Sequence, residues 1–299
     1  MAAILASRAK FFSGHINQLG KGQDYSCHGF SYDETGDFNF MIVCDGHGSQ
    51  FVPITNSRKN KIIDAFQSDY DGLDWGDVLK GETPDINKKL TDYISSLGDT
   101  TGIGTTFVGV KIYDTHYDVY WIGDSSVWIY ENNKRVFVNE KHDYNNPKEM
   151  IRIAVEHKTV PVLDSIDIKK INTNTMSQVP AKYFKFSWRD KISMTHSLGH
   201  QCITGNFISH HRLVKKPGNH YKIIASSDGF TDMVDPDICL LDKQLIENNK
   251  LSAEDYTKYA AEQWKKEWEV HVPGYAKVKQ SFPTDGYDDI AVELFQETT

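Results

Sequence analysis

Aspartate residues that stand beside glycine, or beside a second aspartate, recur next to apolar segments of this chain. They occur at Asp45-Gly46, Gly123-Asp124, Asp228-Gly229 and Asp288-Asp289, with Asp24 and Asp232 as further candidates. Aspartate is a short, hard oxygen ligand, and clustered carboxylates suit Mg²⁺ or Mn²⁺. Two such ions can clamp a phosphoryl group and lower the pKa of a bridging water. Each Asp-Gly pair is also typical of a plain turn, and spacing alone does not bring the aspartates together.

The segment Met41–Gly48 is the centre of this pattern. It reads Met-Ile-Val-Cys-Asp-Gly-His-Gly, so an apolar run leads into a carboxylate and a histidine. The apolar run predicts a buried strand, which Gly46 and Gly48 are expected to end. Asp45 and His47 are then expected at a rigid strand end, which suits a metal ligand and a proton donor. A strand followed by a polar turn is the alternative interpretation.

Composition excludes several classes of protein. The chain has 299 residues, a net charge of −8 and four cysteines, Cys27, Cys44, Cys202 and Cys239, without a Cys-x-x-Cys pair. The acidic balance argues against a nucleic-acid or anionic membrane partner, and the cysteines indicate neither zinc motif nor disulfide framework. The apolar stretch at the N-terminus is too short for a signal peptide, and no segment approaches a membrane span. We therefore expect an intracellular protein, cytoplasmic or nuclear. The sequence does not specify its oligomeric state.

Helices are expected on both sides of a β-rich centre. Thr83-Pro84 opens an amphipathic helix that Gly98 is placed to end, and Asn146-Pro147 opens a second through about Glu156. Two more helices are expected at 58–68 and after Asp235-Pro236. Another begins at Ser252, where Asp255 completes a capping-box pattern, with an apolar stripe at Tyr256, Ala260, Trp264 and Trp268.

Strands are expected mainly in the middle of the chain. Closely spaced β-branched and aromatic runs between Thr105 and Val138 predict an antiparallel meander. Further strands are expected at Lys222–Ala225 and Ile290–Phe295. No repeat or linker divides the chain, so residues 1–299 are interpreted as one domain, with an irregular flap at about 157–200.

An ordered set of short motifs resembles the metal-dependent serine/threonine protein phosphatases of type 2C. The resemblance covers about residues 20 to 295. No single motif is diagnostic, but their order is specific. The motifs are Gln23-Asp24, Asp45-Gly46-His47-Gly48, Gly104-Thr105-Thr106, Gly123-Asp124-Ser125, His142-Asp143 with Asn146-Pro147-Lys148-Glu149, Ser197-Leu198-Gly199, Ser227-Asp228-Gly229 with Asp232, and Asp288-Asp289-Ile290.

The resemblance implies an α+β fold, a four-layer α-β-β-α sandwich of two antiparallel sheets flanked by helices. It implies hydrolysis of phosphoserine and phosphothreonine in phosphorylated proteins by metal-activated water, with no covalent enzyme intermediate. Two Mg²⁺ or Mn²⁺ ions are implied, with a weaker third. In this chain the implied metal residues are Asp45, Gly46, Asp228, Asp288, Asp124 and Asp232, Asp24 would order metal-bound water, and His47 would be the general acid.

The pattern departs from the family at two places. The arginine that usually precedes the opening Gln/Glu-Asp is missing, so Lys21 is the candidate for the substrate phosphate, although an ammonium lacks the two-donor fork. Gln23 is a candidate metal or outer-shell ligand in place of a carboxylate. His200 stands where the family has aspartate. With His196, His210 and His211 nearby a transition-metal site can be imagined, although the spacing matches no known histidine motif.

These departures keep a second hypothesis open. A catalytically weak or inactive regulatory module could keep the same fold. Retention of Asp45, Asp228 and Asp288 favours an enzyme, because buried unpaired carboxylates are costly without a cation.

Overall fold

The computed structural model describes residues 9–16, 23–48, 73–96, 98, 100, 103–157, 168–172, 178–181, 184–185, 191–200, 204–234, 250–271, 274, 276–281 and 287–297. Lys21 and the helices expected at 58–68 and after Asp235-Pro236 lie outside these residues. Among the described helices, none is long and apolar enough to cross a membrane.

One antiparallel sheet carries the segment Met41–Gly48. Its strands run in the order β13-β4-β3-β5-β6-β14, and β2 pairs with the free side of β3. The strands are β2 (Asp24–Asp33), β3 (Gly36–Gly48), β4 (Ile103–Thr105), β5 (Phe107–Ile112), β6 (His116–Ile122), β13 (Leu198–Gly199) and β14 (Ser209–Val214).

A second antiparallel sheet packs against the first. Its order is β1-β18-β15-β7-β8, so the closing strand of the chain lies between the first strand and β15. The strands are β1 (Ala9–Ile16), β7 (Ser126–Glu131), β8 (Lys134–Val138), β15 (Tyr221–Ser226) and β18 (Ile290–Glu297).

Helices and short strands surround the two sheets. The helices are α3 (Trp75–Val78), α4 (Thr83–Ser96), α5 (Pro147–His157), α6 (Asp228–Val234) and α8 (Ala253–Trp264). The short outer strands are β9 (Ile168–Asn172), β10 (Gln178–Ala181), β11 (Phe184–Lys185), β12 (Lys191–Ile192), β16 (Glu267–His271) and β17 (Val278–Ser281). The described part of the region expected as an irregular flap therefore contains short strands.

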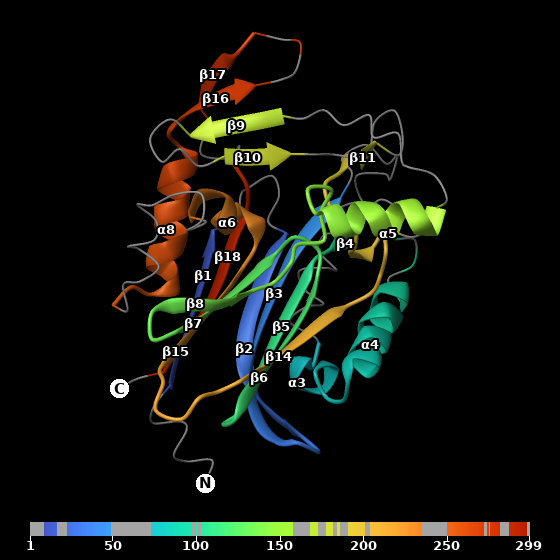
Figure 1. Ribbon diagram of the computed structural model, residues 1–299, viewed down its shortest axis with the longest axis vertical. Coiled ribbons are helices and arrows are strands. Elements are labelled where there is room, and N and C mark those ends of the chain that lie inside the picture. Colours follow the sequence, from blue (N-terminus) through green and yellow to red (C-terminus); the bar gives the residue numbers. More distant parts are fainter. Residues whose placement is uncertain are drawn as a thin grey trace.

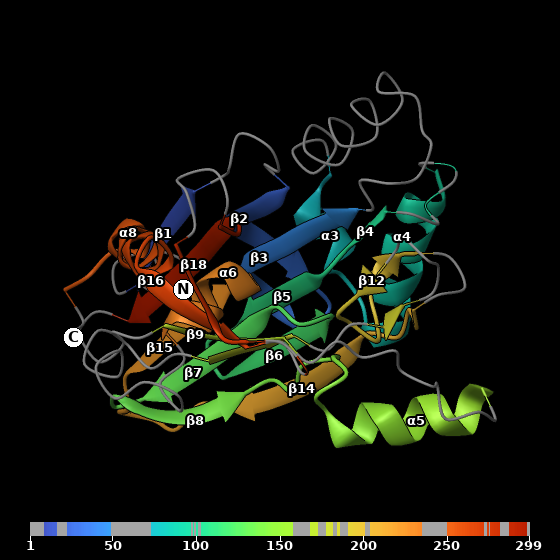
Figure 2. The same ribbon diagram turned by 90° about the horizontal axis from the view of Figure 1, so that it is seen from above.

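Three apolar clusters explain the layering. Residues of adjacent strand positions point to opposite faces, so Val43 packs between the two sheets while Ile42 packs toward α3 and α4. In the second sheet Ile223 faces the first sheet, and Ile224 faces α6 and α8. Figure 1 shows α6 and α8 on one side of the sheets and α3 and α4 on the other, and Figure 2 shows the same arrangement from above. The α+β fold with two large antiparallel sheets is confirmed.

The expected helices within the described residues are present, but the apolar stripe predicted for one of them included a residue that lies beyond the helix. The helices at Thr83 and Asn146-Pro147 are α4 and α5, and Ser252 and Asp255 form the expected capping box. The four-residue repeat was wrong in its last member, because α8 ends at Trp264 and Trp268 lies in β16. Trp268 packs in the same core as Trp264, so its burial imitates helical periodicity.

Two strand predictions were wrong in detail. Gly46 does not end the strand, because β3 continues through it to Gly48 and pairs there with β4, whereas Gly48 is the last residue of β3, as expected. The meander between Thr105 and Val138 is split, since β5 and β6 pair in one sheet and β7 pairs with β15 in the other. The chain changes sheets at Gly123, which has a φ of +97° and where a Cβ would lie 2.6 Å from the Thr106 side chain, so this position requires glycine.

A buried ion pair fixes the outer end of the first sheet. Lys111 Nζ lies 3.0 Å from Asp33 Oδ2 and donates to Gly81 O at 3.0 Å, and the Tyr113 hydroxyl donates to the same Asp33 oxygen at 2.7 Å. Burial alone raises the pKa of Asp33, but the hydrogen bonds from Tyr113 and Lys111 outweigh it and leave the pKa below its usual value.

We predict that Lys111→Met lowers the free energy of unfolding by about 1–3 kcal/mol, because it leaves the partly buried Asp33 charge without its partner. The loss should shrink as the pH falls, since a lowered native pKa contributes stability above the unfolded pKa and loses it as the carboxylate protonates. Urea unfolding at several pH values measures both effects. Lys88→Met, on exposed α4, should change stability by no more than about 0.5 kcal/mol. Equal losses for both variants would contradict the role of the pair.

Candidate active site

The end of β3 is held by bonds to the backbone of Asp45. Asp45 N–H donates to Thr106 Oγ1 at 3.0 Å, and Thr106 N–H donates to Asp45 O at 2.9 Å. The register of β2 on β3 places Asp24 directly opposite Asp45. Side chains two residues apart on a strand share a face, so His47 lies on the same face as Asp45. A carboxylate pair and a histidine therefore come from one strand pairing.

A second group of carboxylates comes from the start of α6 and from the segment directly before β18. Ser227 N–H donates to Ala291 O at 3.1 Å, and Ala291 N–H donates to Ser227 Oγ at 2.9 Å. Asp228 begins α6 directly after Ser227, which is fixed by these two hydrogen bonds. A Cβ on Gly229 would lie 2.0 Å from Asp289 O, so only glycine permits this approach of α6 to the segment that holds Asp288.

The backbone of Gln23 joins the two groups. Its N–H donates to Asp289 Oδ2 at 2.9 Å, and its carbonyl accepts the N–H of Gly46 at 3.1 Å. A Cβ on Gly46 would lie 2.7 Å from that carbonyl oxygen, which explains why glycine follows Asp45. The predicted ligand role of the Gln23 side chain and the predicted phosphate role of Lys21 stay predictions.

The electrostatics of the site show that the predicted aspartates lie within reach of one another. Burial, and then repulsion from Asp24 and Asp228, raises the pKa of Asp45 well above its usual value. Burial likewise raises the pKa of Asp24 and of Asp232, and repulsion by Asp228 and Asp288 adds to both. Such shifts mean that the ionised cluster lacks sufficient positive charge.

Asp124 supports the same conclusion from geometry. Its side chain is 7% exposed, and its Oδ1 atom is buried without a hydrogen-bond partner among the described residues. Burial, and then the charge of Asp228, raises the pKa of Asp124 to about 7. Hard oxygen donors with uncompensated negative charge fit Mg²⁺ or Mn²⁺, so the residues present fit the divalent ions that the sequence pattern suggested.

Lys141 is a cation in this cluster that sequence reasoning missed. Its Nζ donates to Thr231 Oγ1 at 3.1 Å, next to Asp232 on α6. Burial lowers the pKa of Lys141, but attraction by Asp232, Asp124 and Asp228 outweighs this and raises it. The same ammonium lowers the pKa of Asp124 and of Asp232. The residue directly precedes the His142-Asp143 motif, but nothing in its spacing marks it as a neighbour of α6.

His47 and His200 form a direct pair. His47 Nδ1 lies 2.6 Å from His200 Nε2, and the two ring planes are nearly parallel, with 4.7 Å between their centroids. His200 has a φ of +46° and is buried against Gly104, the register partner of His47. Burial, and then the neighbouring His200, lowers the pKa of His47 well below its usual value. The His47 Nε2 atom is buried and has no hydrogen-bond partner among the described residues.

The other histidines singled out in the sequence do not gather around His200. His210 bonds Asp118 Oδ1 at 3.0 Å, and the ring of His211 stacks on Phe137. His196 instead lies beside His142 and Glu149. A cleft of about 1190 Å³ lined by Asp33, Lys111 and Arg212, among others, includes none of the clustered aspartates.

Comparisons with known proteins agree with the fold. The family model of Protein phosphatase 2C matches residues 10–263. No curated protein matches the chain. The S. agalactiae serine/threonine phosphatase is similar in structure, with a TM-score of 0.54 and 14% identity over 97% of this chain and 100% of that one. The Mycobacterium tuberculosis serine/threonine phosphatase PstP/Ppp has a TM-score of 0.52 and 10% identity over 98% and 100% of the chains.

The two packed antiparallel sheets and the family match together identify the class of this protein as protein-serine/threonine phosphatase. More particularly, the chain belongs to the protein phosphatase 2C family.

We predict that Lys141→Met destabilises the metal-free protein by about 1–3 kcal/mol, the usual cost of leaving buried polar groups uncompensated. Without the ammonium, the pKa of Asp124 and of Asp232 rises further. Raised carboxylate pKa values give stability below the unfolded pKa that is lost as the pH rises, so the deficit should be larger at pH 8 than at pH 5.

Thermal unfolding in chelator and in excess Mn²⁺ measures this effect, and Mn²⁺ should restore most of the loss. Lys258→Met on the exposed face of α8 is the matched control. A deficit that does not depend on pH or on Mn²⁺ would show that Lys141 contributes only packing.

Proposed function

We propose that this chain hydrolyses phosphoserine and phosphothreonine in intracellular phosphoproteins with the help of two Mg²⁺ or Mn²⁺ ions. The observation that carries the proposal is the acidic cluster. Burial and the charges of Asp228 and Asp288 raise the pKa values of the aspartates on β2, β3 and α6, although these residues are far apart in the sequence. A fold that needed only stability would not retain such repulsion, because burying unpaired charge is costly.

The residues of the cluster divide into proposed roles. Asp45 and the Gly46 carbonyl would hold the ions between the two groups of carboxylates, with Asp228 and Asp288 on the α6 and β18 side. Asp24, opposite Asp45, would order water next to the ions. Asp124 and Asp232 would form a weaker third position, and the ammonium of Lys141 already supplies positive charge there.

The ions, when bound, would neutralise the phosphate and lower the pKa of an attacking water, which is the chemistry that slow phosphomonoester hydrolysis needs. The chain's own part is to fix that centre. Thr106 holds the backbone of Asp45, and Gln23 joins Gly46 to Asp289. These bonds keep the carboxylates in place before substrate arrives, and such preorganisation is a large part of catalysis.

His47 would donate a proton to the leaving serine or threonine oxygen. Two imidazoles in contact cannot both present a lone pair to each other, so one of the two facing nitrogens carries hydrogen. When His200 donates, Nδ1 of His47 accepts and the His47 proton resides on Nε2. The lowered pKa keeps His47 neutral in the free protein, and an approaching phosphate dianion would favour its charged form.

The second candidate is a catalytically weak or inactive module with the same fold. The sequence favours it at one place, since the residues directly before Gln23 contain no arginine and Lys21 is left to bind the phosphate. The position of Lys141 among the carboxylates is compatible with both candidates. Its ammonium can take the place of one bound ion, but it cannot take the place of two. Activity measurements therefore decide between them.

We predict Mn²⁺- or Mg²⁺-dependent hydrolysis of an aryl phosphate and of a phosphothreonine peptide, abolished by chelator. Asp228→Asn should lower kcat/KM more than about 100-fold, because even outer-shell changes around metals cost 10–100-fold. Asp92→Asn, an exposed aspartate of α4, is the matched control. Turnover that survives both the chelator and Asp228→Asn would refute the metal centre. Absence of metal-dependent turnover in the folded wild type would favour the inactive module.

We predict that the effect of His47→Ala depends on the leaving group. A serine or threonine oxygen needs a proton, so the peptide reaction should slow by about 10²–10⁴-fold, the usual contribution of general acid catalysis. An aryl oxide leaves without protonation, so its reaction should slow far less. Parallel kcat/KM measurements on the two substrates test this, and equal losses would remove His47 as the acid.

A further inference from the structure

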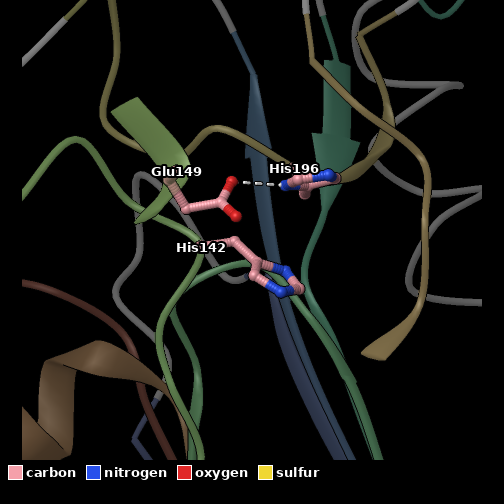
Figure 3. A group of neighbouring side chains, drawn as sticks. All are labelled: His142, Glu149 and His196. Carbon is pink, nitrogen blue, oxygen red and sulfur yellow. Dashed lines mark ion pairs between the residues drawn. The ribbon is translucent and has the colours of Figure 1, made fainter. Parts of the chain in front are cut away.

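His142, Glu149 and His196 form a compact polar cluster that the phosphatase chemistry does not use. His142 follows β8, Glu149 lies in the first turn of α5, and His196 lies just before β13. Figure 3 shows the three side chains converging from these separate segments. Their exposures are only 5%, 8% and 4%, and one ligand atom from each lies within 4.8 Å of the others.

We propose that His142, Glu149 and His196 bind a transition-metal ion of the zinc type, at a site separate from the aspartate cluster. Two imidazoles and one carboxylate are the ligand set of many zinc sites, with water in the fourth position. Magnesium and manganese prefer all-oxygen sites, so this cluster selects a different class of metal.

The distances require little movement of the side chains. His196 Nδ1 lies 2.8 Å from Glu149 Oε2, and the rings of His142 and His196 have centroids 4.6 Å apart. Ligand atoms around tetrahedral zinc stand roughly 3.4 Å apart when each bond is about 2.1 Å. Glu149 and His196 therefore separate slightly and His142 moves inward.

One ring nitrogen of His142, Nδ1, can bind a metal at the cost of a single weak hydrogen bond. Burial, and then the neighbouring His196, lowers the pKa of His142 to about 4, so the ring is neutral and keeps a lone pair. Gly123 N–H donates to Nδ1 at 3.3 Å, which is a long and weak bond, and Nε2 lies 3.0 Å from Ser209 Oγ. A metal on Nδ1 replaces the weak bond. The Nε2–H keeps donating to Ser209, as the second nitrogen of a metal-bound histidine usually does.

Glu149 is ionised and already accepts a hydrogen bond from the Thr195 hydroxyl. Burial raises the pKa of Glu149, but hydrogen bonds from His196 and Thr195 outweigh it and lower the pKa to about 2. The Thr195 hydroxyl donates to Glu149 Oε2. A hydroxyl bond to a ligating carboxylate is the kind of outer contact that orients metal ligands.

Arg152 is the present competitor for this site. Its Nη2 donates to Glu149 Oε2 at 3.1 Å and lies 3.3 Å from His196 Nδ1. The side chain is 25% exposed, so the guanidinium can turn to solvent when a metal takes its place. Metal binding is therefore an exchange of one cation for another, and Arg152 sets its strength.

The position of the site connects it to His47. His196 lies four residues before His200, and between them β13 pairs with β4, beside the end of β3. A metal that joins α5 to His196 fixes the segment that presents His200 to His47. Occupancy would thus stabilise the geometry of the His47–His200 pair without touching the aspartate cluster.

The test uses Co²⁺ as the probe for the zinc position, in excess Mg²⁺ to fill the aspartate cluster. Co²⁺ bound tetrahedrally through imidazole absorbs visible light far more strongly than Co²⁺ in octahedral oxygen sites. We expect one such Co²⁺ per chain, displaced by Zn²⁺, with a higher thermal unfolding temperature in Zn²⁺. These readouts do not depend on phosphatase activity, so they stand or fall separately from the proposed function.

Three variants sharpen the test. His196→Gln should weaken binding at least about tenfold, whereas His220→Gln, at an exposed histidine between β14 and β15, should not change it. Arg152→Met should tighten binding about tenfold by removing the competing charge, which corresponds to ~1.4 kcal/mol. Circular dichroism of each metal-free variant checks that it is folded.

Two outcomes would overturn the proposal. One is no strong Co²⁺ absorption in either the wild type or Arg152→Met, which would leave the cluster as an ion-pair network. The other is absorption that His196→Gln and His220→Gln reduce equally, which would assign it to surface histidines.

Discussion

Repulsion between buried carboxylates is the constraint on which the rest of this structure depends. Asp24 and Asp45 are register partners on neighbouring strands, and Asp228, at the start of α6, and Asp288, just before β18, add further charge. Such a cluster opposes folding, so the surrounding parts must be stable enough to tolerate it. Two sheets with three apolar clusters supply that stability, and the cost of the charges is concentrated at one end of β3.

Cations are the natural answer to this repulsion, and the chain uses more than one kind. Lys141 is built into the fold beside Asp124 and Asp232, whereas the remaining charge calls for exchangeable divalent ions. We propose a similar exchange at Glu149, where Arg152 and His196 now balance a buried carboxylate. Both proposed metal sites thus follow from one property of the chain, its buried acidic groups.

The histidine pair gives this chain a feature that its resemblance to the family did not foretell. His200 replaces an aspartate of the family pattern and contacts His47 through ring nitrogens. An aspartate would favour a charged His47, whereas a buried neutral imidazole disfavours it. The proton supply of this phosphatase is thus expected to differ from that of relatives with a carboxylate at this position.

The sequence by itself determined the kind of elements and the kind of chemistry. Apolar runs marked β3, β15 and β18, cap residues marked α4 and α8, and the aspartates beside glycines marked the acidic cluster, because these signals are local. Only the tertiary structure decided where the chain changes sheets at Gly123, that β3 continues past Gly46, and that Trp268 lies outside the helix. It also decided which partners meet, Lys141 with α6, His200 with His47 and His196 with Glu149. Those contacts join residues far apart in the chain, and strand register and packing fix them, which no local pattern records.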